Sequence, residues 1–145
     1  MAVIRFTAAD ALQTTTVPAD IYPSEITQIT GPTKSGSGKS THFFVDIAIT
    51  DGRFKGKTRT VIFNSGTNNI SMLGDMQFFP QAYFLIVDSA ITGREVKPEE
   101  FDLDTEALVH KPFDAAWGVM TVDGHIVNVI NSFHPAGYKS SAPAF

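Results

Sequence analysis

The sequence predicts a mainly β protein, a small five-stranded Greek-key barrel with one helix between its third and fourth strands. Three observations lead to this fold class. Residues 42–50 alternate with a period of two, which is typical of a strand with one buried face. Asp51-Gly52 and Asp123-Gly124 each lie between two β-like runs, as hairpin turns do. Residues 80–91 fall between these two hairpins and have the flanking residues of a helix.

The N-terminal part of the chain is only weakly patterned. Three apolar side chains in residues 3–6 predict a short strand. The β-branched residues of 24–30 predict the first strand of the barrel. Residues 31–39 are rich in Gly, Ser and Lys, which predicts a loop.

The second strand has two distinct faces. The face predicted to be buried carries Phe43, Val45, Ile47 and Ile49. The opposite face carries His42, Phe44, Asp46, Ala48 and Thr50. The turn that begins at Asp51-Gly52 continues to Gly56, and residues 58–64 predict the returning third strand.

The second half of the chain predicts a helix followed by a hairpin. Residues 65–75 are polar and irregular. Pro80 and Gly93 bracket the predicted helix, although a buried strand over 84–87 is the alternative. An acidic loop over 97–106 with a helical turn at 104–108 follows, and then strands over 113–122 and 125–133, with Trp117 expected in the core. This order suits a barrel of the OB type. We expect one domain over 1–133, with an extension at 1–21 and a tail at 134–145.

Composition excludes several classes of protein. The 145 residues suffice for one domain with its own core. The absence of cysteine excludes disulfides, thiol catalysis and thiolate metal sites. No apolar run is long enough to span a membrane, and the first twenty residues lack the apolar region of a signal peptide. These features predict a cytoplasmic protein.

Charge is distributed unevenly along a chain whose net charge is −4. Residues 34–59 contain six cationic and two acidic side chains, whereas residues 94–106 contain two cationic and six acidic ones. A local positive patch acts over about 8 Å at physiological salt, so it can bind an anion on an acidic protein. Solubilising lysines on an exposed hairpin are the alternative explanation.

No motif predicts an enzyme, a cofactor or a metal site. The run Gly36-Ser37-Gly38-Lys39-Ser40 resembles a phosphate-binding P-loop, but Thr33 stands where that motif needs glycine, and a strand follows in place of a helix. The four histidines are scattered, and the acidic residues of 95–106 fall in a predicted loop.

Aromatic residues within the positive stretch suggest what it binds. Phe54 lies between Arg53 and Lys55 in a turn, and Phe44 lies on the less apolar face of its strand. Exposed rings beside cations bind single-stranded nucleic acid, because bases stack on the rings and cations follow the phosphates. The alternatives are a Phe54 ring folded back over the barrel end and a Phe44 ring in a second small core.

The residues also resemble a known family. The run from Lys34 to Gly38, the strand after it and the turn from Asp51 to Lys57 are similar to the central segment of phage-encoded OB-fold single-stranded DNA-binding proteins. Residues 108–113 and 128–135 are similar to their closing strands, so the resemblance covers about 22–135. It implies DNA coating without catalysis, in the cytoplasm of the host. The acidic tail that many such proteins carry is missing.

We therefore predict a non-enzymatic protein that binds single-stranded DNA with little sequence preference, without a cofactor or metal. RNA, replication or recombination proteins and further copies of the chain are additional candidate partners. We expect the loop over 31–39 and the turn between the second and third strands to form one wall of a positive groove. The predicted contacts combine the cations of the positive stretch with its two aromatic residues: Lys34, Lys39, Phe44, Arg53, Phe54, Lys55, Lys57 and Arg59. The alternative is a β-rich phage structural or assembly protein that binds no nucleic acid.

Overall fold

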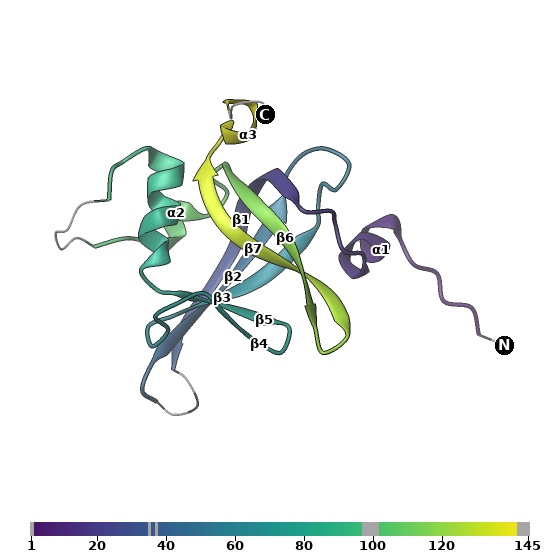
Figure 1. The fold of residues 1–145 in the computed structure, drawn as a ribbon, viewed down its shortest axis with the longest axis horizontal. Coiled ribbons are helices and arrows are strands. Elements are labelled where there is room, and N and C mark those ends of the chain that lie inside the picture. The colour runs from purple at the N-terminus through teal and green to yellow at the C-terminus, as the bar shows by residue number, and fades with distance from the viewer. Residues whose placement is uncertain (1, 35, 37, 97–101, 142–145) are drawn as a thin grey trace.

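The fold is a single curled sheet of seven strands that stays open as a half-barrel (Figure 1). The computed structural model describes residues 2–34, 36, 38–96 and 102–141. The strands are β1 (Asp20–Lys34), β2 (Thr41–Ile49), β3 (Thr58–Asn64), β4 (Ser71–Leu73), β5 (Met76–Pro80), β6 (Phe113–Val122) and β7 (His125–Pro135). Their order in the sheet is β4-β5-β3-β2-β1-β6-β7. The helices are α1 (Ala8–Thr14), α2 (Tyr83–Thr92), η1 (Thr105–Leu108), which is a 3₁₀ helix, and α3 (Tyr138–Ser141).

The mainly β class is confirmed, but the prediction of five strands is wrong. Part of the segment predicted to be irregular forms the β4–β5 hairpin, whose turn contains Gly74 at φ +62°. β5 pairs in parallel with β3, and Phe78 lies opposite Ile62. The loop predicted over 31–39 begins later, because β1 continues to Lys34. Most of the acidic loop predicted over 97–106 lies outside the described residues.

The N-terminal strand predicted over residues 3–6 is also wrong. These residues are not in a strand, and helix α1 follows them. Thr7 begins α1 with a capping box, in which its hydroxyl accepts from the Asp10 backbone N–H while the Asp10 carboxylate accepts from the Thr7 N–H. No residue of α1 is buried, so the local cap defines this helix more than packing does.

The core lies on the concave side of the curled sheet. Its largest fully buried side chains come from most of the strands: Trp117, Phe63, Phe79, Phe113, Ile26, Ile47 and Ile130. Trp117 is 1% exposed, as predicted, and its indole N–H donates to the hydroxyl of Ser24 at 3.2 Å. α2 covers one end of this core, because Phe84 packs on Phe63 at 4.3 Å between ring centroids. The prediction of a helix here is confirmed, and Gly93 ends it at φ +75°.

Two glutamine side chains bridge the seam where a closed barrel would pair its last strands. Gln77 of β5 is 3% exposed, and its amide donates to the Ile130 carbonyl at 2.7 Å and accepts from the Ile130 N–H at 2.8 Å. Gln13, in the last turn of α1, pairs in the same way with the Gly56 carbonyl and the Thr58 N–H on the β3 side. A primary amide has the same donor and acceptor as a peptide group, so each glutamine replaces one step of strand pairing.

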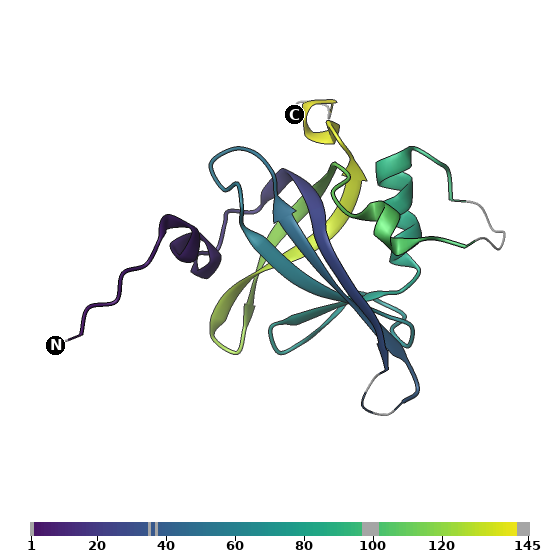
Figure 2. The same ribbon diagram turned by 180° about the vertical axis from the view of Figure 1, so that it is seen from behind.

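The segment after α1 fills the remainder of the seam. The Asn128 side chain on β7 accepts from the Val17 N–H at 2.9 Å and donates to the Val17 carbonyl at 3.0 Å. Val17 itself is fully buried. Figure 2 shows α1 beside the sheet, with the first residues extending away from it.

Candidate nucleic-acid interface

The two loops predicted to form one groove lie at opposite ends of β2. One loop enters β2 and contains Lys39, and the turn over 51–56 leaves it (Figure 2). β2 has nine residues, so its ends are roughly 25–30 Å apart at about 3.3 Å per residue. The prediction that both loops line one wall of a groove is therefore wrong. The alternating pattern predicted the strand between the two loops, but the length of that strand, which separates the loops, was not taken into account.

The predicted contacts at the β2–β3 turn do not form a joint site with an open ring. Phe54 is half-buried against the core and meets Tyr22 edge-on at 5.9 Å between centroids. The guanidinium of Arg53 lies 5.5 Å from the Phe54 ring centroid. Arg53 and Lys55 are both exposed. Phe54 thus packs back over the barrel end, which is the alternative that the sequence left open.

Lys57 and Arg59 point into the seam. Lys57 is only 8% exposed, and its ammonium donates to the carbonyls of Leu12 at 3.3 Å and Gln13 at 2.8 Å. Arg59 is half-buried and donates to the Asp75 carbonyl. Both side chains therefore lie apart from the exposed Arg53 and Lys55, although all four belong to one cationic stretch of the sequence.

Phe44 lies on the outer face of the sheet, in a row of four residues that face away from the core. This outer aromatic row runs across four neighbouring strands through Thr30, Phe44, Ile62 and Phe78. Phe44 and Phe78 are half-buried, whereas Ile62 between them is 3% exposed. The two phenyl rings flank a buried aliphatic residue and keep part of their own surface in solvent, which is the arrangement that base stacking needs.

Lys34 and Lys39 lie on one side of this row, toward the start of β2, and the loop between β1 and β2 that they flank is called the lysine loop below. Lys34 pairs with Thr41 in the β1–β2 ladder, one position beyond His42, and both lysines are exposed. The His42 ring meets Phe44 edge-on at 6.0 Å.

A hydrogen-bond network under the lysine loop fixes its base. The side-chain oxygen Oδ1 of Asn64 accepts from the Gly66 N–H at 2.7 Å, so the NH₂ group of the same side chain faces the ring nitrogen of His42 at 2.7 Å. That amide also donates to the Ser40 hydroxyl at 3.3 Å. These hydrogen bonds fix the loop between β1 and β2 beside the outer aromatic row.

A hollow of about 210 Å³ lies on the opposite side of the row, beside Phe44 and Ile62. Its walls come from β2, β3 and the β4–β5 hairpin: Phe44, Arg59, Thr60, Ile62, Asp75 and Met76. Asp46 faces outward beside it and accepts from the Thr60 hydroxyl at 2.5 Å. Asp46 and Asp75 thus place negative charge beside this hollow, on the side away from the lysine loop.

Phe78 and Met76 are the members of this surface that sequence reasoning missed. Both residues lie between the stretch over 65–75 that was predicted to be irregular and the helix predicted over 80–91. The run from Met76 to Phe79 alternates between outward and buried side chains, since Gln77 and Phe79 are 3% and 0% exposed. A buried glutamine breaks the apolar alternation, so this short strand has no clear period-two signal.

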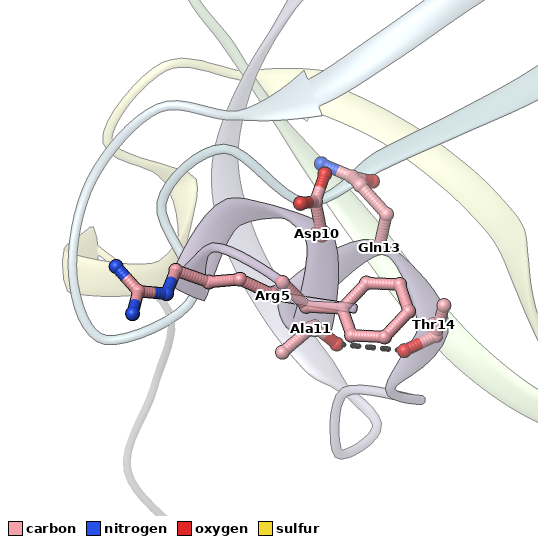
Figure 3. Close-up of a pocket in the computed structure, with 6 residues that line it drawn as sticks. Arg5, Asp10, Ala11, Gln13 and Thr14 are labelled. Atoms are coloured by element: carbon pink, nitrogen blue, oxygen red, sulfur yellow. Dashed lines mark hydrogen bonds between the residues drawn. The ribbon is translucent and has the colours of Figure 1, made fainter. Parts of the chain in front are cut away.

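Other candidate sites are weaker. The hollow between the N-terminal arm and α1 has about 690 Å³, but every residue lining it is exposed, and Arg5 extends away from Asp10 and Gln13 (Figure 3). Within the described part of the chain, no three acidic or histidine side chains are close enough to hold a metal ion. No helix among the described residues has the length and apolar character needed to cross a membrane.

Comparison of the chain with models of known protein families and with curated protein sequences gives no match. Function is therefore argued from the geometry of the surface alone.

Proposed function

We propose that this protein binds single-stranded DNA with little sequence preference along the outer aromatic row. The observation that carries the proposal is the pair of half-buried rings on the outer face, Phe44 and Phe78, beside the lysine loop. Bases of any sequence stack on such rings, each contributing about 1–3 kcal/mol. Lys34 and Lys39 contact phosphates at the entrance of the path. Binding of this kind involves no chemical step, so the protein is not an enzyme.

The proposal includes an OB-type assignment of the half-barrel. Strands β1, β2, β3, β6 and β7 take the roles of the five barrel strands, and α2 precedes the fourth of them. OB folds bind oligonucleotides on the face of their second and third strands, which is where Phe44 and Ile62 lie. The β4–β5 hairpin is then an insertion that widens this face. A phage-encoded origin and action in the host cytoplasm, in replication or recombination, belong to the same proposal.

Anisotropy of a fluorescein-labelled dT15 oligonucleotide tests the proposal. Phe44→Ala should weaken binding by about 1–3 kcal/mol, which is roughly fivefold to 150-fold, because one stacking surface is lost. Phe78→Ala should act in the same direction. Phe54→Ala is the matched control: it removes a phenyl ring at the other end of β2 and should leave affinity unchanged.

The dependence of binding on salt separates the two clusters of cations. Replacing Lys34 and Lys39 together by Gln should reduce the log–log salt slope by about 1.4, since each phosphate contact contributes about 0.7. Replacing Arg53 and Lys55 by Gln should leave the slope unchanged. The opposite result would move the site to the β2–β3 turn, and failure of the wild-type protein to bind dT15 at low salt would refute the function.

A second candidate function, assembly with other proteins, is favoured by one observation. The edge hairpin β4–β5 exposes Leu73 at 69% and Met76 at 42%, and Ile70 just before it at 39%. An exposed apolar edge strand is suited to docking another protein. Stable higher assemblies in the absence of nucleic acid, seen by light scattering, together with no binding of dT15, would support this function over the first.

A further inference from the structure

Lys57 and Arg59 place two positive charges at the seam, near the start of β3. Lys57 immediately precedes β3 and Arg59 is the second residue of the strand, and both side chains line the same hollow. The Lys57 ammonium contacts only carbonyl oxygens in the described structure. The Arg59 guanidinium donates to one carbonyl, that of Asp75, and its Nε is shielded from solvent with no acceptor in the described residues.

These charges are poorly neutralised. Among the described residues, no carboxylate forms an ion pair with Lys57 or Arg59. Burial lowers the pKa of Lys57, and the charge of Arg59 lowers it further. Burial also lowers the pKa of Arg59, while the nearby Asp75 raises it. The fold thus keeps two cations out of water with less compensating charge than an ion pair would supply.

Both cations line a second hollow, of about 200 Å³. It lies between α1, β3 and β7, and Thr14, Thr15, Thr16 and Asn128 also line it. The threonine hydroxyls and the Asn128 amide already donate to backbone carbonyls, so among these side chains Lys57 and Arg59 are the donors for a ligand. One water occupies about 30 Å³ of liquid volume, so a phosphate group with several waters fits this space. Ammonium and guanidinium groups donate charge-assisted hydrogen bonds to phosphate oxygens.

We propose that this seam, centred on Lys57 and Arg59, is a binding site for a phosphate group, and that it takes a phosphodiester of the strand leaving the outer aromatic row. Arg59 connects the two places, because it lines both the seam hollow and the hollow beside Phe44. The assignment of the phosphodiester rests on the proposed function. A free phosphate or pyrophosphate ion is the other source of the same chemistry, and the experiment separates the two.

The first arm measures the salt dependence of dT15 binding. Arg59→Gln should weaken binding about tenfold at low salt, because it removes a charge-assisted contact, and should reduce the log–log slope by about 0.7. Arg59→Lys keeps the charge and should retain the slope. Arg53→Gln removes one charge from the exposed turn and is the control. Circular dichroism melting confirms that each variant is folded.

The outcomes of this arm keep the two proposals apart. If the wild-type protein binds dT15 and Arg59→Gln has the wild-type slope, the phosphodiester assignment is overturned while the proposed function stands. If the wild-type protein does not bind dT15, the proposed function and the phosphodiester assignment both fail.

The second arm tests the phosphate site without DNA. Pyrophosphate, at ionic strength held constant with NaCl, should raise the unfolding temperature of the wild-type protein but not that of Arg59→Gln. Such a difference supports a phosphate site at the seam, even if dT15 does not bind. Equal shifts in both proteins, or no shift in either, overturn the site.

Discussion

Replacing Gln77 tests whether a side-chain amide closes the seam of the half-barrel. Gln77→Met keeps most of the volume and the apolar contacts but leaves the Ile130 N–H and carbonyl without their partner. Each buried polar group left unsatisfied costs about 1–3 kcal/mol, so the loss of both partners lowers the free energy of unfolding by about 2–6 kcal/mol. With a urea m-value of about 2 kcal/mol/M, the unfolding midpoint falls by roughly 1–3 M.

Equilibrium urea unfolding, followed by tryptophan fluorescence, measures this loss, because Trp117 lies in the core. Hydrogen exchange at the Ile130 amide gives a local readout and should become faster in the variant. Gln28→Ala is the control, since Gln28 is exposed and donates only to the Thr30 hydroxyl at 3.3 Å. It should change stability by less than about 0.5 kcal/mol. A Gln77→Met protein as stable as wild type, with Ile130 still protected, would show that packing alone closes the seam.

Two further predictions concern the ends of β1. Gly31→Ala should destabilise the fold by about 2–4 kcal/mol in urea, because Gly31 has φ +139° and a Cβ there would lie 2.6 Å from the His42 carbonyl oxygen. Gly36→Ala, where a Cβ meets no atom within 4 Å, should be neutral, and equal effects would contradict the argument. At the other end, the hydrogen bond from Lys139 lowers the pKa of Asp20 below its ordinary 3.8. A lowered carboxyl pKa stabilises the fold above pH 3.8 and loses this effect as the pH falls through the folded-state pKa. Asp20→Asn should therefore reduce stability at pH 6 by up to about 1 kcal/mol, a difference that disappears in melts near pH 2. A difference that persists at that pH would contradict the linkage.

Elements with a strong local signal could be predicted from the sequence. The period of two in β2, the Asp-Gly turns and the glycine after α2 each act through neighbouring residues, so the strands, hairpins and helix followed from them. The burial of Trp117 followed from the alternation of its strand. The β4–β5 hairpin has no such signal, because its three-residue strand β4 pairs only with β5.

The candidate site was predicted less well than the fold. Phe44 was placed correctly on the outer face, because alternation within one strand decides it. The partner ring Phe78 comes from a strand 34 positions later, and only the parallel pairing of β5 with β3 brings it into the row. Lys57 belongs to a cationic run in the sequence, but its burial depends on the carbonyls at the end of α1, 45 residues earlier. A count of charged residues along the sequence does not distinguish a solvent-exposed lysine from a lysine whose side chain is buried in the fold.

The two hydrogen bonds between Val17 and the Asn128 side chain have a consequence for the order of folding during synthesis. The two residues are 111 positions apart, so the segment after α1 has no seam to occupy until the ribosome has released β7. Val17, which is fully buried in the fold, therefore stays exposed until β7 has been made, so this contact forms late.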